Sequence, residues 1–157
     1  MRRILVYTFV VLLAGCGFHL RGQVALPYST LHVSGPSGTS LTNSLTRVLR
    51  SSGVRLVDRK EDAEVTLVIL SDVKEKSILS LSAAGRAQEY ELRERVSFRI
   101  ITAGEPDLPA GEIISQRSIS FNDAQVLAKE SEESLLYRDM ENDVVQQLLR
   151  RLQAAKK

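Results

Sequence analysis

The chain has 157 residues and a formal net charge of +2, with 43% hydrophobic and 25% charged residues. This length accommodates one ordinary domain, and this balance of residues excludes both a disordered tail and a multi-span membrane protein. The excess cations, Arg2 and Arg3, lie in a segment that we expect to be removed, which leaves a neutral chain. A neutral chain lacks the basic field that non-specific nucleic-acid binding requires, so we expect no nucleic-acid partner.

The N-terminal segment combines this basic start with an apolar run. The run extends from Ile4 to Ala14 and is interrupted only by Tyr7 and Thr8. As a helix it would reach about 16 Å, at about 1.5 Å per residue, whereas the hydrocarbon core of a bilayer is about 30 Å thick. The run is therefore typical of a secretory signal peptide and too short for a membrane span.

The apolar run ends in Leu13-Ala14-Gly15-Cys16, which resembles the bacterial lipobox. The resemblance implies cleavage before Cys16, attachment of a diacylglycerol to its thiol and N-acylation, for example with palmitate. An ordinary signal peptide followed by a buried cysteine is the alternative. Each buried methylene contributes about 0.8 kcal/mol, so these acyl chains would anchor the protein in a membrane. Gly17 stands where an aspartate would signal retention at the inner membrane, and by resemblance to enterobacterial sorting this favours the outer membrane.

The remainder divides into a tether and one domain. We expect residues 1–15 to be the removed signal peptide, residues 16–28 a lipidated tether, and residues 29–157 a single α+β domain. Residues 30–34 alternate between apolar and polar side chains, which predicts a strand. Cys16 is the chain's only cysteine, so no intramolecular disulfide forms.

A helix is predicted from Thr39 to Gly53, because leucines and a valine recur there with helical spacing. Thr39 or Ser40 can cap its start, and Gly53 can adopt the left-handed conformation that ends a helix. Residues 54–57 predict a second, short strand. The charge run over residues 58–62 predicts a solvated turn.

Two longer strands are predicted next. Residues 65–70 are nearly all apolar and predict a buried or central strand, with a weaker continuation to Leu81. Residues 89–100 alternate clearly, and only Glu94 interrupts their apolar face. The two segments therefore predict an extended hairpin with its tip near Gly85. A Gly- and Pro-rich loop over 104–111 and another strand over 112–121 follow.

The last predicted element is a helix from about Ala128 to Gln153. Apolar residues recur every four positions along it, with acidic residues near its start and basic residues near its end. The order of elements predicts an α+β fold, in which two amphipathic helices pack on one face of a four- to five-stranded mixed sheet with a long β-hairpin.

The sequence contains no convincing enzyme motif. HExxH, Walker and GxGxxG patterns are absent, and His19 and His32 lie in unrelated contexts. An acylated Cys16 leaves no thiolate for catalysis or metal binding. We therefore expect neither an enzyme nor a metal site, and no cofactor beyond the acyl groups on Cys16.

Several stretches resemble one known family, the LPS-assembly lipoproteins called LptE. They are Cys16-Gly17-Phe18-His19-Leu20-Arg21-Gly22, Ala87-Gln88-Glu89-Tyr90-Glu91-Leu92, Phe121-Asn122-Asp123, Leu127-Ala128-Lys129-Glu130 and Leu148-Leu149-Arg150-Arg151-Leu152. The resemblance covers nearly all of the expected mature chain and implies a non-enzymatic role. Proteins of this family plug the lumen of the outer-membrane barrel LptD, assist its assembly, and bind lipopolysaccharide on its way to the outer leaflet. The alternatives are an accessory lipoprotein of another barrel-assembly or lipid-trafficking complex, and an anchored periplasmic enzyme.

Lipopolysaccharide recognition gives a first set of candidate site residues. Lipid A carries phosphates and acyl chains, so a contact site combines basic side chains with nearby apolar surface. Lys129 matches the family's Leu-Ala-Lys stretch, and Arg86 lies at the predicted hairpin tip. For both, a solvated surface charge is the alternative interpretation.

A second set of candidates lies on the predicted strand after Gly85. Arg93, Arg95 and Arg99 form a basic row on one strand face, interleaved with glutamates. We interpret the row first as polar surface that faces the barrel lumen. A contact of Arg93 and Arg95 with lipopolysaccharide is the second interpretation.

Overall fold

The structure is a computed structural model that describes residues 26–36, 38–104, 106, 108–121 and 126–155. The predicted signal peptide, the lipidation site Cys16 and most of the tether lie outside these residues. Leu26 and Tyr28 already pack against the core, ahead of residue 29, where we expected the domain to begin.

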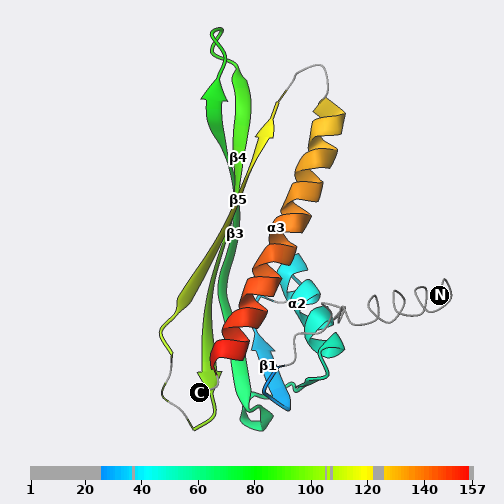
Figure 1. Cartoon of the computed structure of the whole chain (residues 1–157), viewed down its shortest axis with the longest axis vertical. Helices are drawn as coiled ribbons and strands as arrows, with labels where there is room; N and C mark the ends of the chain where they lie inside the picture. Colours follow the sequence, from blue (N-terminus) through cyan, green and yellow to red (C-terminus); the bar gives the residue numbers. More distant parts are fainter. Residues whose placement is uncertain (1–25, 37, 105, 107, 122–125, 156–157) are drawn as a thin grey trace, which may run out of the picture.

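The described chain forms one mixed sheet and two α-helices. Its strands run in the order β2-β1-β3-β4-β5, in which β1 is parallel to β2 and β3, and the other neighbours are antiparallel. Both helices lie on the same side of the sheet (Figure 1), as the sequence predicts. The elements are β1 (Thr30–Ser34), α2 (Ser40–Ser51), β2 (Arg55–Leu56), the short 3-10 helix η1 (Lys60–Asp62), β3 (Val65–Leu81), β4 (Ala87–Thr102), β5 (Gly111–Ser120) and α3 (Val126–Ala155).

The predicted hairpin is the longest feature of the sheet. β3 and β4 remain paired from Val65 opposite Thr102 to Leu81 opposite Ala87. Between them Gly85 adopts a φ of 74° and closes the turn, which confirms the predicted tip. The weak apolar pattern beyond residue 70 is thus a continuous strand. The tip and the start of α3 lie at the same end of the molecule (Figure 1), hereafter the distal end.

A β-bulge at Leu70 changes which residues of β3 face the helices. Ile69 pairs with Phe98 and Ser71 with Ser97, so Leu70 is the extra residue. Because side chains alternate along a strand, the extra residue inverts the pattern. Before the bulge the helix-facing residues are apolar; after it they include Asp72, Lys74 and Lys76, which pair with helix-facing positions of β4.

The hydrophobic core consists of two clusters. The larger one joins α2, the C-terminal half of α3 and the proximal half of the sheet, which is the half away from the distal end. It contains fully buried Leu45, Leu67 and Leu148. The smaller one contains Leu92, Ile119 and Met140 and lies under the middle of α3. Thr39 accepts a hydrogen bond from the Thr42 amide at 3.2 Å and caps α2, as predicted.

Candidate functional site

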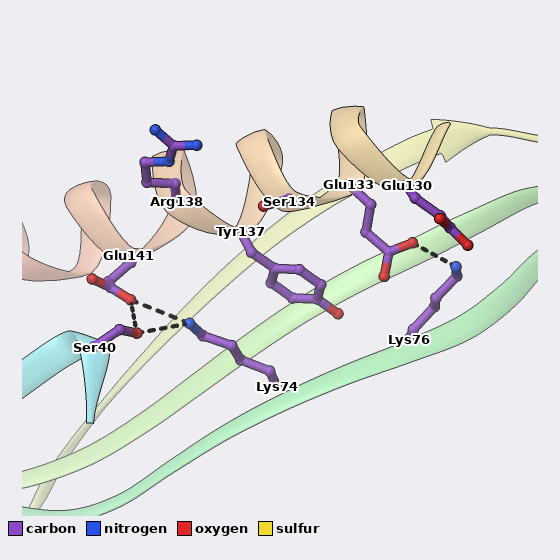
Figure 2. A pocket seen from close by; sticks show the side chains of 9 residues that line it. All are labelled: Ser40, Lys74, Lys76, Glu130, Glu133, Ser134, Tyr137, Arg138 and Glu141. Carbon is purple, nitrogen blue, oxygen red and sulfur yellow. Dashed lines mark hydrogen bonds and ion pairs between the residues drawn. The ribbon is translucent and has the colours of Figure 1, made fainter. Parts of the chain in front are cut away.

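A groove of about 700 Å³ opens between α3 and β3, beside the start of α2. Figure 2 shows that its side chains come from all three elements and carry charges of both signs. The lining residues are Ser40, Lys74, Lys76, Glu130, Glu133, Ser134, Tyr137, Arg138 and Glu141. The groove therefore lies where β3 has become polar after its bulge.

Lys74 is the central cation at the inner end of this groove. Its Nζ lies 3.2 Å from Oε2 of Glu141 and 3.6 Å from Oε1 of Glu94. The Nζ also lies 5.8 Å from the centre of the Tyr137 ring, within the range of a cation–π contact. One ammonium group thus lies within ion-pair distance of a carboxylate on α3 and of another on β4.

Glu141 links α3 to α2 as well as to the sheet. Its carboxylate accepts hydrogen bonds from the Ser40 hydroxyl and from Lys74 (Figure 2). It accepts a third from the Ser44 hydroxyl at 2.7 Å. Burial raises the pKa of Glu141, but these three hydrogen bonds outweigh it and hold the pKa below its ordinary value. Glu141 is consequently a stable anion that joins three elements.

Glu94 lies in a different environment from Glu141. Its side chain is 0% exposed, and neither carboxylate oxygen has a hydrogen-bond partner among the described residues. Burial raises its pKa to about 7, opposed by Lys74 and reinforced by Asp72 and Glu141. Burial also raises the pKa of Asp72. We use the name charged cluster for Asp72, Lys74, Glu94 and Glu141.

The other lysine of the groove is already paired. Lys76 donates to Glu133 at 2.6 Å and lies 4.4 Å from the centre of the Tyr90 ring. The Tyr137 hydroxyl donates to the carbonyl oxygen of Glu75 at 3.0 Å. These contacts fasten α3 to β3 around residues 133–137. Lys74 and Lys76 are thus both paired with carboxylates of the same groove.

The candidates Lys129 and Arg86 both lie at the distal end. Lys129 is 15% exposed, and its Nζ lies 2.8 Å from Glu132 and 3.1 Å from the Ser120 hydroxyl. Arg86 lies in the hairpin turn, where its carbonyl oxygen accepts from the Ser82 amide at 2.8 Å. The apolar residues near them are largely exposed, among them Ile78, Leu79, Leu81 and Leu127.

The candidates Arg93 and Arg95 lie elsewhere, on the sheet face opposite the helices, which we call the outer face. Arg93 donates to Glu91 at 2.7 Å, and the Arg95 Nε lies 3.8 Å from Glu112. Arg95 also lies between exposed Val73 and Ile114 in one cross-strand row. The structure therefore places the four candidates in two regions, the distal end and the outer face, and not in one site.

Sequence reasoning missed the charged cluster, although part of it left a signal. Glu94 interrupts an otherwise apolar strand face, and Glu141 follows Met140 on the buried side of α3. Lys74 left none, because the bulge at Leu70 changes the alternation of β3 just before it. Recognising Lys74 required the pairing register.

Among the described residues, no group of three or more His, Cys, Asp or Glu side chains has an arrangement that could hold a metal ion. In the same part of the chain, no helix combines the length and the hydropathy needed to span a membrane.

Two solved structures that are similar to this chain are bacterial lipoproteins. A solution structure of lipoprotein B from Nitrosomonas europaea matches with a TM-score of 0.75 and 41% identity over 88% of this chain and 91% of that one. A crystal structure of rare lipoprotein B from Shewanella oneidensis matches with a TM-score of 0.74 and 27% identity, over 81% of this chain and 96% of that one. The class of protein that this fold defines is a small α+β lipoprotein domain.

The sequence comparisons specify the family. The family model LptE, described as lipopolysaccharide-assembly, matches residues 28–152. The LPS-assembly lipoprotein LptE of Pectobacterium atrosepticum is 30% identical over 91% of this chain and 79% of its own length. The LPS-assembly lipoprotein LptE of Yersinia enterocolitica is 32% identical over 91% of this chain and 70% of its own length. This chain belongs to the LptE family, a family of non-enzymatic lipoproteins, so we assign it no catalytic site.

Proposed function

We propose that the protein is an outer-membrane lipoprotein that plugs an LptD-type barrel, assists the assembly of that barrel, and binds lipopolysaccharide during its export to the outer leaflet. The observation that carries this proposal is the match to the lipopolysaccharide-assembly family over residues 28–152. In this proposal acylated Cys16 anchors the chain on the periplasmic side of the outer membrane, while the domain occupies the barrel lumen.

The ion pairs on the outer face of the sheet support its role as a plug surface. The interior of a large outer-membrane barrel is polar, so a plug surface needs paired charges with few large apolar areas. Arg93 with Glu91 and Arg95 with Glu112 supply such pairs. We therefore assign Arg93 and Arg95 first to contact with the barrel wall.

The distal end has the composition that lipid A recognition requires. Lys129 and Arg86 supply cations for phosphate groups, and the exposed side chains of Ile78, Leu79 and Leu81 supply apolar surface for acyl chains. A phosphate that binds Lys129 must compete with Glu132, which lies 2.8 Å from the ammonium group. Binding here exchanges one anion for another and costs little in desolvation.

Depletion of the protein in living cells tests the proposal. We expect less lipopolysaccharide on the cell surface and less of the folded barrel, because both depend on the plug. Normal levels of both would refute the proposal. Affinity purification of the tagged chain discriminates it from the alternative: one large barrel protein supports the plug, whereas recovery of the general barrel-insertion machinery supports an accessory role in another complex.

A further inference from the structure

The charged cluster has an excess of acid. It contains the carboxyl groups of Asp72, Glu94 and Glu141 but only one ammonium group, that of Lys74. If every group were ionised, the cluster would be anionic inside the domain, where unpaired charge is costly. Retention of one proton by the cluster removes part of that cost.

Glu94 is the group best placed to retain the proton. In the pairing register it faces Lys74 on β3 and Ser115 on β5, while Glu141 and Tyr137 approach from α3. Its oxygens accept no hydrogen bond from the described residues, whereas Glu141 accepts three. Hydrogen bonds to a carboxylate stabilise its ionised form, so Glu141 keeps its charge and Glu94 does not.

We propose that Glu94 is a reversible proton-binding site whose charge state sets how tightly Lys74 holds α3 and α2 to the sheet. When Glu94 is neutral, Lys74 pairs with Glu141 alone. When Glu94 loses its proton, the new carboxylate competes for the same ammonium group and weakens its pairing with Glu141. Because Glu141 also binds Ser40, the change reaches α2.

The sign of the pH dependence follows from the burial of Glu94. Its pKa rises from 4.5 to about 7 in the fold, so the native protein holds a proton that the unfolded chain releases. The resulting stabilisation is complete below the unfolded pKa and is lost as the pH rises through the folded one. The protein therefore becomes easier to unfold between these two values.

Two measurements on the full-length chain, purified in detergent, test the proposal. Carbon-detected NMR of labelled glutamate side chains reports the titration of Glu94 directly, and we expect a midpoint near 7. Chemical unfolding reports the linked stability: the unfolding constant of the wild type rises by up to about tenfold per pH unit between about pH 5 and about pH 7. In Glu94→Gln we expect this contribution to be absent.

Matched variants separate the cluster from the rest of the surface. Glu133→Gln removes a carboxylate that pairs with Lys76 outside the cluster and leaves the titration of Glu94 unchanged. Glu141→Gln removes a neighbouring negative charge that favours the neutral form, so the midpoint of Glu94 falls. Relative to the intrinsic exchange rate, which rises with pH in any protein, backbone amides of α3 near Glu141 lose protection above the midpoint in the wild type but not in Glu94→Gln.

Two results would overturn the proposal. One is a Glu94 midpoint below about pH 5 in the wild type, since that value is ordinary for a solvated carboxyl group. The other is an equal pH dependence of unfolding in the wild type and in Glu94→Gln. If Glu94→Gln does not fold, the wild-type titration and the Glu141→Gln shift decide the question.

Discussion

At the scale of single residues, electrostatic balance in this domain depends on Lys74. Its ammonium group lies beside the carboxyl groups of Glu94, which is fully buried, and Glu141, which is nearly so. Lys76 makes a shorter contact with Glu133, but both of these side chains reach solvent. The cost of removing one partner of an ion pair depends more on the burial of the charge left behind than on the distance between the two groups. These two lysines therefore make unequal contributions to stability.

We expect Lys74→Met to destabilise the fold by about 3–5 kcal/mol near neutral pH, because it leaves buried carboxylates without a counter-ion. The loss becomes smaller as the pH falls, since protonation removes those charges. Lys76→Met is the matched control, and its cost is about 0–1 kcal/mol. Chemical unfolding at two pH values measures both variants; equal costs would contradict this prediction.

Gly111 illustrates a purely steric constraint. A Cβ atom at this position would lie 2.6 Å from Cζ of Phe98, whose ring covers the glycine across the β4–β5 pair. We expect Gly111→Ala to cost about 1–3 kcal/mol, as overpacking of a core does. In a Phe98→Leu background the same substitution becomes less costly, because the ring edge is gone. Unfolding curves of the four chains give the coupling energy, and simple additivity would contradict the steric explanation.

At the scale of elements, α3 has two parts with different attachments. Its C-terminal half contributes Val144, Leu148 and Leu152 to the large core cluster. Its N-terminal half packs on the small cluster around Met140 and is also held by polar contacts of Glu133, Tyr137 and Lys129 with the strands. Stability is not uniform along such a helix, and the N-terminal half is the part that opens first.

Two leucines of α3 test this difference. Leu148→Ala removes a fully buried side chain and costs about 2–5 kcal/mol, whereas Leu135→Ala at an exposed position stays within about 0.5 kcal/mol. Thermal and chemical unfolding check both values. Comparable costs for the two variants would show that the distal half of α3 is packed as firmly as the proximal half.

Prediction from sequence succeeded where a local pattern determines structure. The alternation over residues 89–100 predicts a strand, and the apolar residue at every fourth position along α3 predicts a helix; both form. The positive φ of Gly85 confirms the hairpin tip. The charged cluster was not predictable in this way. Its members come from strands and helices far apart in the chain, and the bulge at Leu70 conceals the face to which Lys74 belongs.

At the scale of the whole molecule, the proposed function requires two separate surfaces. The outer face carries Arg93 and Arg95, while the distal end carries Arg86 and Lys129. Figure 1 shows that the hairpin extends past α2 toward the distal end, so this end is displaced from the main core. A protein built in this way can contact a barrel wall with one surface and a lipid with the other.

Two charge reversals separate these surfaces. We expect Lys129→Asp to weaken lipopolysaccharide binding by the purified protein at least several-fold while the complex with the barrel persists. Arg95→Glu has the opposite pattern, with weaker recovery of the barrel and retained lipopolysaccharide binding. Lys60→Asp, in η1 at the end remote from the hairpin tip, is the control. Unchanged binding by Lys129→Asp would reject that residue as part of the site.

The bulge at Leu70 also constrains how sequences of this kind can diverge. Deleting Leu70 itself would remove the bulge and leave Ser71 opposite Ser97 and Lys74 opposite Glu94. Loss of a residue between Ser71 and Lys74, with the bulge kept, would instead turn Lys74 to the opposite side of the sheet, because side chains alternate along a strand. An alignment of related chains should therefore show a one-residue gap in this part of the strand only at residue 70, and a fixed spacing between residues 71 and 78.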